Sequence, residues 1–441
     1  MSSFKVAILG CGTVGGGVAR IILDNMDSLT QRSGKKIELV KILDLFPLES
    51  SKKHAIPRNL FCGTGDTVSK EDASKYTDEI INDSTIDLVV ESIGGSSEFM
   101  LNLVTKVLNG KKHLVTANKA LLAKFNKQII DTAFKNDKAI GFEASVCGAI
   151  PIIKGINECF TGDQIESVSG IMNGTSNFIL SKMNLENLSF EAALKQAQEK
   201  GYAEADPTLD VNGGDAGHKL MILLKIMYGM DVTIEDLSVV GIDTISDSDT
   251  SFAREINTVI KLICYSKKTD NGVYATVRPM MVRKKNFLSE INNATNAVKV
   301  SGKYSQDNIF IGQGAGSLET GSAIVSDIVF IAKYGTASLR NYPSQNLALL
   351  PFENMEIAYN IIFETEDKPG ITGLVTTAIG KEKINIDTVS HNIRTNKTAG
   401  AIFSIATTPC KYSQIVKAIE SIKATDPNVL IKYPKIIPIL D

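Results

Sequence analysis

The sequence predicts an α/β protein whose first part is a doubly wound parallel sheet. Over residues 1–140, short apolar runs of strand length alternate with longer segments of helical period, which is the pattern of strands joined by crossover helices. The first apolar run also leads directly into a glycine-rich turn that opens a helix. A second pattern, over roughly the last ninety residues, predicts a smaller module of mixed strands and helices.

The glycine-rich turn follows an expected strand at residues 6–9 and precedes a helix expected over 14–23. Its residues are Gly10, Cys11, Gly12, Thr13, Val14 and Gly15. In such a turn the first glycine permits the tight bend, the second lets a pyrophosphate approach the backbone, and the third lets helix and strand pack closely. We therefore predict dinucleotide binding here, with a purely structural glycine turn as the alternative.

The second expected strand, residues 36–44, ends in Asp44. A carboxylate at this point accepts both ribose hydroxyls of NAD and repels the 2′-phosphate of NADP, so NAD is the predicted cofactor and NADP the alternative. The spacing from Gly15 to Asp44 is longer than the usual ~20 residues, and Lys52 and Lys53 are near enough in sequence to reach a phosphate. A turn residue at a strand end is the other interpretation of Asp44.

Five further segments, 86–95, 101–110, 112–123, 128–139 and 140–146, continue the alternation of strand and helix. Ligands of doubly wound sheets lie beyond the carboxyl ends of the strands. The residues expected at those ends are Ser92, Gly94, Thr116 and Lys119. Lys119 is therefore predicted to face the crevice, and a solvated surface lysine is the alternative.

Composition limits the classes of partner. The chain of 441 residues is long enough for two to four domains, and its 47 basic and 49 acidic side chains give a net charge of -2. We therefore expect neither nucleic acid nor a membrane as a partner. The six cysteines form no CxxC pair and the four histidines have no metal-ligand spacing, which predicts reduced thiols and no zinc. No apolar stretch is long enough for a signal peptide or a membrane span, so a cytoplasmic protein is expected.

The segment GYAEADPTLDVNGGDAGHKL, residues 201–220, concentrates carboxylates ahead of Lys219. A helix is expected from Asp215 onward, and it places Lys219 on the same face as Asp215, beside an apolar stripe. A partly desolvated lysine of this kind can exchange a proton with a hydroxyl or carbonyl. The alternative is a solvent salt bridge, which contributes only a few tenths of a kcal/mol.

Five separated segments resemble the homoserine dehydrogenase family over nearly the whole chain. They are GCGTVGGGV at 10–18, TANKALLA at 116–123, FEASVCGAIPII at 142–153, GIMNGTSNFIL at 170–180 and the segment at 201–220. The resemblance implies reversible hydride transfer between L-homoserine and L-aspartate 4-semialdehyde with NAD or NADP, in threonine, methionine and isoleucine biosynthesis. It also implies a homo-oligomer, either a dimer or a tetramer.

The resemblance implies a role for each matching residue. Lys219 would be the general acid/base, Lys119 would lie beside substrate and nicotinamide, and Gly201, Glu204, Asp210 and Asp215 would bind the substrate. Gly314 and Gly316 would join the cofactor site where the chain returns to the first domain. An alkali cation, expected to be sodium, would bind oxygens of Glu143, Val146, Gly148 and Ile150. The chain departs from the family by carrying Leu43 where many relatives have the arginine that binds NADP.

The last part of the chain predicts the order βαββαβ, with strands at 355–367, 384–393, 399–408 and 428–439. Its opening, DKPGITGLVTTAIGKEKINI, resembles the ACT domain, a ferredoxin-like module that senses amino acids. The resemblance implies an effector site, with L-threonine as the expected ligand. Its residues would be Asp367, Gly370, Ile371 and Asn385. A dimerisation module without ligand is the alternative.

Three domains are therefore expected. A Rossmann-type NAD(P)-binding domain covers 1–140 and is completed by 310–340, an α+β substrate and dimerisation domain covers 141–309, and the ACT regulatory domain covers 355–441. The competing functions are another Rossmann oxidoreductase acting on a small amino-acid aldehyde or alcohol, and an amino-acid sensor without catalytic activity.

Overall fold

The parallel sheet predicted for the first part of the chain is present, in the strand order β2-β1-β3-β4-β5. Every pairing within it is parallel. The strands are β1 (Ser3–Leu9), β2 (Lys36–Leu43), β3 (Leu88–Glu91), β4 (His113–Thr116) and β5 (Ile140–Gly141). The order reverses between β1 and β3, so a crevice for ligands is expected beyond the carboxyl ends of these two strands.

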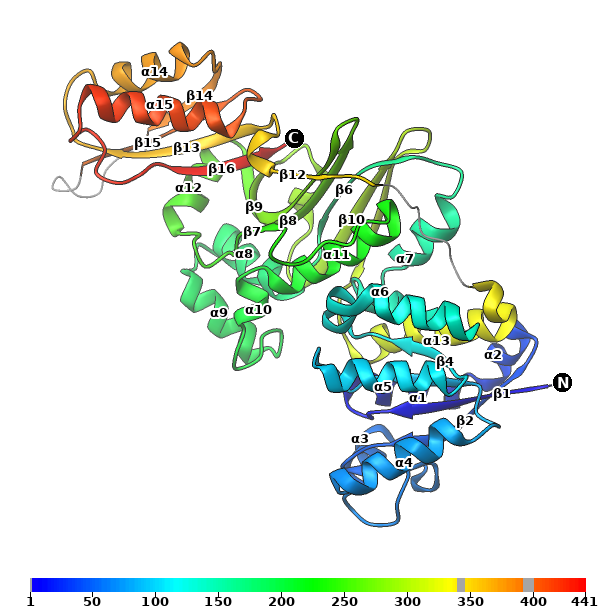
Figure 1. Cartoon of the computed structure of the whole chain (residues 1–441). Coiled ribbons are helices and arrows are strands. Elements are labelled where there is room, and N and C mark those ends of the chain that lie inside the picture. Colours follow the sequence, from blue (N-terminus) through cyan, green and yellow to red (C-terminus); the bar gives the residue numbers. More distant parts are fainter. Residues whose placement is uncertain (1, 339–345, 392–399) are drawn as a thin grey trace. The chain divides into compact units, whose positions relative to one another are not determined.

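The computed structural model describes residues 2–338, 346–391 and 400–441. The chain divides into two units, each assembled from three separate segments (Figure 1). Unit 1 comprises Met1–Ile165, His218–Ile234 and Ser301–Asn346, and unit 2 comprises Glu166–Gly217, Glu235–Val300 and Leu347–Asp441. Within the described residues, no helix has the length and apolar character needed to cross a membrane.

Helices cover both faces of the sheet in unit 1. Val6, Ile8 and Val90 belong to one buried cluster together with residues of α1 and α13. The alternating residues Ala7 and Val89 are also fully buried and point to the opposite face. The longer helices of the unit are α1 (Thr13–Asp24), α2 (Met26–Ser33), α3 (Pro47–His54), α4 (Lys70–Asn82), α5 (Glu98–Asn109), α6 (Lys119–Asn136) and α13 (Ser317–Tyr334).

One predicted strand of this region is much shorter than expected. The expected strand 140–146 ends after Gly141, and a 3₁₀ turn, η2 (Glu143–Ser145), follows. The Ser145 hydroxyl donates to the Phe142 carbonyl at 2.6 Å, a local bond that competes with strand pairing. The unit also contains α7 (Ile152–Lys154), the π-helical turn η3 (Gly155–Cys159) and β11 (Gln306–Gln313).

A large mixed sheet organises unit 2, and its strands follow the order β10-β6-β8-β9-β16-β13-β15-β14. The strands of the central part are β6 (Ile165–Ile171), β8 (Thr258–Thr269), β9 (Gly272–Arg283) and β10 (Thr295–Gly302). The accompanying helices are α8 (Gly174–Glu186), α9 (Phe190–Glu199), α10 (Thr208–Val211) and α12 (Asp247–Glu255). Helix α11 (Gly214–Tyr228) begins in unit 2 and ends in unit 1.

Strand β9 has two unlike edges. Along one edge it pairs with β8 over its full length. Along the other edge it is covered in pieces by three short parallel pairings. Val273 and Tyr274 pair with β12 (Leu349–Leu350), Thr276 and Val277 with β7 (Ser238–Val239), and Met281 and Val282 with Ile439 and Leu440 of β16.

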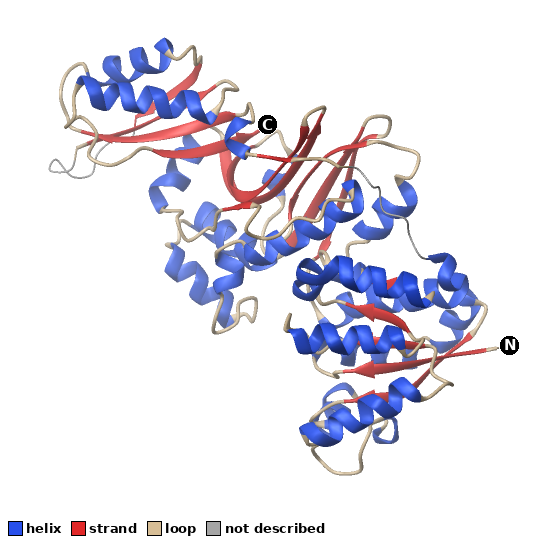
Figure 2. Ribbon diagram, viewed as in Figure 1, coloured by secondary structure: helices blue, strands red, loops and turns tan. Residues whose placement is uncertain are grey.

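The C-terminal region has the predicted order of strands and helices. It consists of β13 (Ala358–Thr365), α14 (Ile371–Lys381), β14 (Ile386–His391), β15 (Ala401–Thr407), α15 (Tyr412–Thr425) and β16 (Lys435–Leu440). Figure 2 shows its two helices on one face of its strands. The last strand is shorter than the predicted 428–439, because Ile431 reaches β13 through a single amide bond to the Glu364 carbonyl and Pro434 has no N–H to continue the ladder. The expected residues 392–393 and 399 of two strands lie outside the described residues.

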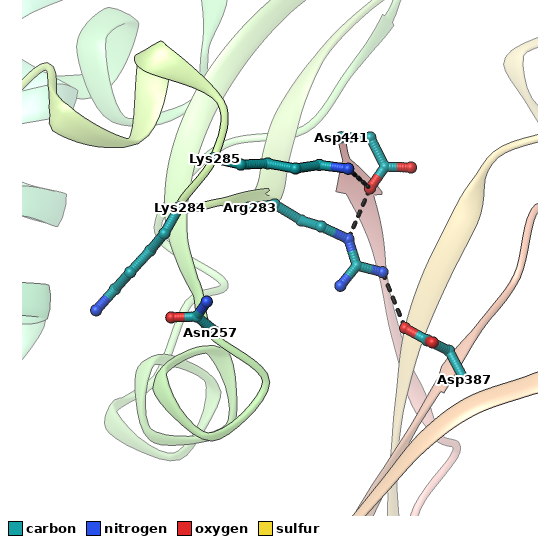
Figure 3. A pocket seen from close by; sticks show the side chains of 6 residues that line it. All are labelled: Asn257, Arg283, Lys284, Lys285, Asp387 and Asp441. Atoms are coloured by element: carbon teal, nitrogen blue, oxygen red, sulfur yellow. Dashed lines mark hydrogen bonds and ion pairs between the residues drawn. The ribbon is translucent and has the colours of Figure 1, made fainter.

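The C-terminal region is joined to the centre of unit 2 by its core and by ion pairs. One buried cluster contains Met280 and Val282 of β9 together with Ile361, Phe363 and Ile405 of the C-terminal strands. At the end of β9, the Arg283 guanidinium lies 2.6 Å from the Asp441 carboxylate and 3.0 Å from that of Asp387 (Figure 3). Because the sheet and the core are continuous, the C-terminal region is not an appended body within this unit.

Candidate active site

The glycine turn lies beyond the carboxyl end of β1, where the strand order reverses. A Cβ on Gly15 would lie 2.0 Å from the Gly10 carbonyl oxygen, so only glycine allows helix α1 to pack this closely. A Cβ on Gly12 would meet nothing within 4 Å, which leaves this part of the backbone open to a ligand. Gly12 caps α1 without a side-chain hydrogen bond, so the first amides of the helix are available to a phosphate.

Asp44 connects the end of β2 to the glycine turn. Its Oδ2 accepts the amide of Cys11 at 2.6 Å, and its Oδ1 accepts the amide of Phe46 at 2.8 Å and the hydroxyl of Ser50 at 3.2 Å. Burial and the nearby Asp44 charge raise the pKa of the Cys11 thiol to about 12, so this cysteine stays protonated. Asp44 therefore organises the backbone of the glycine turn.

A buried carboxylate that the sequence analysis did not select holds the next loop. Glu91, the last residue of β3, is 1% exposed. Its Oε1 accepts the amides of Ile93 and Gly94 at 2.8 and 3.0 Å, and its Oε2 accepts the Thr116 hydroxyl at 2.6 Å. The ends of β3 and β4 are thereby tied together. The sequence does contain a signal for this buried carboxylate. A glutamate follows directly after the apolar run LVV, where an unpaired charge would be costly.

Asn118 extends this network to Lys119. The Asn118 amide N–H donates to the Thr116 hydroxyl at 3.0 Å, and its side chain donates to the Gly95 carbonyl at 2.7 Å. Its Oδ1 also caps helix α6 by accepting the Leu121 amide at 3.1 Å. Lys119 is the first residue of that helix and is half-buried. The network thus joins Gly94 and Thr116 and positions the start of α6, where Lys119 lies, while the Ser92 hydroxyl donates to the Gly10 carbonyl at 2.7 Å.

The returning segment joins the same edge. The Ser317 hydroxyl, at the start of α13, donates to the Thr13 carbonyl at 2.6 Å, and Gly316 caps the helix with a positive φ of 137°. A Cβ on Gly148 would lie 2.7 Å from the Gly314 carbonyl oxygen. Gly314 and Gly316 therefore lie within the same unit as the glycine turn, as the family resemblance implied.

In unit 2, the side chain of Asn173 holds two of the predicted substrate-binding carboxylates. Its Nδ2 donates to Asp210 Oδ1 at 2.7 Å and to Asp215 Oδ2 at 2.8 Å. Its Oδ1 accepts the Ser176 amide at 2.7 Å and so caps helix α8. Asn173 is 4% exposed and Asp215 is 8% exposed. One amide thus fixes the start of α8 and the two carboxylates with respect to each other.

Helix α8 is held in turn by a buried lysine. Lys261 of β8 is 1% exposed, and its Nζ lies 2.5 Å from the Ile291 carbonyl, 3.0 Å from Asn292 Oδ1 and 3.2 Å from Asn177 Oδ1. Burial lowers the pKa of this ammonium to about 7, and the Glu290 charge opposes the shift. The sequence analysis did not select Lys261, because a lone lysine in a strand gives no signal of its burial.

Comparisons with known proteins agree with this geometry. A family model described as homoserine dehydrogenase matches residues 151–329, and a model of the homoserine dehydrogenase NAD binding domain matches residues 10–143. The homoserine dehydrogenase of Neisseria gonorrhoeae is 33% identical over 435 residues, which cover 97% of this chain and 96% of that one. The chain belongs to the homoserine dehydrogenase family.

Further relatives support the same assignment. The homoserine dehydrogenase of Bacillus subtilis is 38% identical over 333 residues, covering 76% of this chain and 74% of that one. A crystal structure of a homoserine dehydrogenase from Thiobacillus denitrificans superposes with a TM-score of 0.89 at 32% identity and covers 100% of this chain and 99% of that one. The protein is therefore an NAD(P)-dependent oxidoreductase that interconverts L-homoserine and L-aspartate 4-semialdehyde.

The remaining residues predicted for the homoserine dehydrogenase reaction differ in their surroundings. Lys219 lies one helical turn after Asp215 on α11 and is only 7% exposed. Glu204 is exposed and lies in the loop before α10, and Gly201 in the same loop has a positive φ of 73°. Lys119 and Lys219 both belong to unit 1.

The turn predicted to bind an alkali cation has well-defined partners. Each Glu143 carboxylate oxygen accepts one backbone amide at 2.8 Å, from Ile153 and Lys154. Burial and the Asp327 charge raise the pKa of Glu143 to about 7. The Ile150 carbonyl accepts the Ile152 amide at 2.8 Å. In the part of the chain that the structure describes, no group of three or more His, Cys, Asp or Glu side chains could hold a metal ion. The Glu143 carboxylate therefore holds the backbone at the start of α7.

Proposed function

We propose that Lys219 is the general acid/base of the dehydrogenase reaction and that Lys119 orients the substrate beside the nicotinamide. The observation that carries the proposal is the pair of carboxylates held by Asn173, because Asp215 lies one turn before Lys219 on the same helix. Asp210, Asp215 and Glu204, with the backbone at Gly201, would bind the amino group and hydroxyl of homoserine. The two carboxylates suit the substrate ammonium, since opposite charges attract strongly in a partly buried site.

The proton and the hydride have separate routes in this proposal. When bound, the nicotinamide accepts the hydride from the carbinol carbon of homoserine. Lys219 removes the hydroxyl proton as the carbonyl forms and returns it in the reverse reaction. Gly12, Thr13, Val14 and Gly15 would hold the pyrophosphate at the start of α1.

The test compares Lys219→Ala and Lys119→Ala with the control Lys195→Ala, an exposed lysine of α9. We expect each of the first two variants to lose about 10²- to 10⁴-fold in kcat at saturating NAD and homoserine. The KM for NAD and the melting temperature should change little. Near wild-type turnover of Lys219→Ala would show that another group moves the proton.

We further propose that NAD is used in preference to NADP. Asp44 at the end of β2 and Leu43 in place of arginine support this preference. The test is the ratio of kcat/KM for the two cofactors in the wild type and in Lys53→Ala. If NADP were preferred and Lys53→Ala removed that preference, the phosphate would be held by this lysine and the role of Asp44 would be rejected.

We propose that the C-terminal region is a ferredoxin-like ACT module that senses L-threonine. Its βαββαβ order and its strand order β16-β13-β15-β14 support this classification. Asp367 precedes α14, Gly370 caps it with a positive φ of 90°, and Ile371 is its first residue. Asn385 is exposed just before β14, and its carbonyl accepts the Thr408 amide at 3.0 Å.

The effector test must keep the chain intact, because truncation near Glu353 would expose the core that β9 shares with the C-terminal strands. Threonine is titrated against the wild type, Asn385→Ala and the control Asn428→Ala, an exposed residue of the same region. We expect roughly 5- to 150-fold weaker substrate binding at saturating threonine. Only Asn385→Ala should lose the effect. Equal inhibition of all three proteins would move any threonine site elsewhere.

Three expectations complete the proposal. The domain boundaries would be 1–140 with 310–340, 141–309 and 355–441. Sodium would bind oxygens of Glu143, Val146, Gly148 and Ile150, with backbone carbonyls as its ligands. Cys147 and Gly148 shape this turn with positive φ angles of 55° and 51°. A homo-oligomer, dimer or tetramer, would be the active form, and the exposed Ile309 and Ile311 on β11 support a protein contact.

A further inference from the structure

A cavity of about 160 Å³ lies between helices α6 and α11 in unit 1, and none of its lining residues is among those assigned to the dehydrogenase reaction. Leu122 of α6 and Met221 and Ile222 of α11 form apolar walls, and Met230 and Val232 close it from the loop after α11. A cavity of about 150 Å³ in another protein holds a molecule of benzene. The space between these helices is therefore large enough for a small organic ligand.

A buried amide without a partner lines this cavity. Asn126 is 8% exposed, and among the residues that the structure describes neither its Nδ2 nor its Oδ1 has a hydrogen-bond partner. Unpaired polar groups in the interior are costly, and an apolar residue of the same shape would be more stable there. Helix α6 is also kinked next to this side chain, because Phe125 has φ −126° and ψ 19°. Neither proline nor glycine causes the kink.

The charged residues that line the cavity are three lysines and the carboxylate of Asp231. Lys124 and Lys127 come from α6, and Lys225 comes from α11. Lys127 pairs with Asp131 at 2.6 Å and Lys225 pairs with Asp231 at 2.8 Å. Among the described residues Lys124 makes no ion pair, and its ammonium lies 4.9 Å from the centre of the Phe125 ring. The rim therefore favours an anion.

We propose that this cavity binds a small branched aliphatic 2-hydroxy carboxylate. The Asn126 amide presents one donor and one acceptor side by side. Its Nδ2 would donate to the ligand carboxylate, and its Oδ1 would accept the ligand hydroxyl. The carboxylate would also face Lys124, and the aliphatic body would contact Leu122 and Met221. This ligand uses the apolar walls, the unpaired amide and the charge of the rim together.

Such a ligand would influence turnover through the two helices that it contacts. Helix α6 begins at Lys119, and helix α11 carries Lys219 less than one turn before Met221. A ligand that prefers one arrangement of these helices shifts their equilibrium by its difference in affinity. This effect on turnover rests on the proposed roles of Lys119 and Lys219, whereas binding to the cavity does not.

The test is calorimetric titration of the full-length protein with 2-hydroxy-3-methylbutanoate. We expect a Kd of about 1 mM, the range for a ligand of this size. Asn126→Leu should weaken binding at least tenfold without lowering the melting temperature, because it removes an unpaired amide. Lys124→Ala should also weaken binding, and the control Lys135→Ala, an exposed lysine further along α6, should not.

Two comparisons separate this site from the dehydrogenase site. The analogue 3-methylbutanoate lacks the hydroxyl, so it should bind the wild type more weakly than the hydroxy acid does. Asn126→Leu should bind the two compounds with equal affinity. Equal binding of the hydroxy acid to the wild type and Asn126→Leu would overturn the proposal, as would no binding up to about 20 mM. Binding lost in Lys219→Ala but kept in Asn126→Leu would place the ligand in the dehydrogenase site and also overturn it.

Discussion

In unit 1 the buried carboxylate of Glu91 gathers two backbone amides and a hydroxyl, whereas in unit 2 the neutral amide of Asn173 gathers two carboxylates. The Glu91 carboxylate fixes the shape of the loop after β3, which would face the cofactor. The neutral amide of Asn173 donates one hydrogen bond to each of the carboxylates of Asp210 and Asp215. The two networks thus use opposite groups: a carboxylate positions neutral backbone in unit 1, and a neutral amide positions carboxylates in unit 2.

Asn173→Ala tests the network of unit 2 and has the largest expected effect. It removes hydrogen bonds to two carboxylates, each contributing about 1.5–3 kcal/mol. We expect the KM for homoserine to rise about 10- to 100-fold, while the KM for NAD stays unchanged. Steady-state kinetics with each substrate varied in turn measures both values.

The matched control for this variant is Ser189→Ala. Ser189 caps α9 by accepting the Ala192 amide at 3.3 Å, so the variant loses a helix cap without affecting the carboxylates. Both variants should lose about 1 kcal/mol of stability from the cap, but only Asn173→Ala should change the KM for homoserine. A similar KM for homoserine in both variants would show that Asn173 acts only as a helix cap.

Glu91→Gln tests the network of unit 1, and its expected effect is smaller. Glutamine keeps one acceptor for the amides of Ile93 and Gly94 but offers Thr116 an N–H in place of an oxygen. We expect the KM for NAD to rise about tenfold, which corresponds to ~1.4 kcal/mol, with little change in the KM for homoserine at saturating NAD. The control Glu98→Gln, exposed in the first turn of α5, should leave both constants unchanged. An increase in the KM for homoserine alone would contradict the separate roles of the two networks.

The sequence predicted the residues that a motif carries and missed those that hold them. Gly12 and Lys119 were predictable because a glycine turn and a strand end have fixed positions in a doubly wound sheet. The contacts of Glu91 with Thr116, 25 residues away, and of Lys261 with partners 30 or more residues away were not, because single-sequence patterns do not report such pairs. Asn173 was predictable as a helix cap, but its second role depends on a loop that approaches it from residues 201–215.

The fold shows the same limit. Strand and helix order in the C-terminal region follows from local periodicity, and it was predicted correctly. The pairing of β16 with β9 was not predicted, because it joins segments that no local pattern connects. Unit 2 therefore contains one continuous sheet that the C-terminal strands share with β9.

A pH series tests stability in place of kinetics and concerns Lys261, which contacts helix α8 in unit 2. The pKa of Lys261 is lowered from 10.5 to about 7 in the folded protein, so the unfolded chain binds more protons between these values. The free energy of unfolding should therefore rise with pH above about 7, by at most ~1.4 kcal/mol per pH unit. Below about pH 7, the cost of burying the charged ammonium should not change with pH. Urea unfolding of the wild type and Lys261→Met over about pH 6–9 measures the difference. Parallel curves would show that Lys261 keeps an ordinary pKa.

The covered edge of β9 has a consequence for biosynthesis. The pieces that border it come from three places in the chain, and the last of them, β16, follows β9 by about 150 residues. At a synthesis rate of about 5–20 residues per second, Met281 and Val282 stay without their partner strand for roughly 8–30 s. An unpaired strand edge is a site of association with other chains. We expect nascent chains that have passed β9 but lack β16 to be the species that molecular chaperones bind longest.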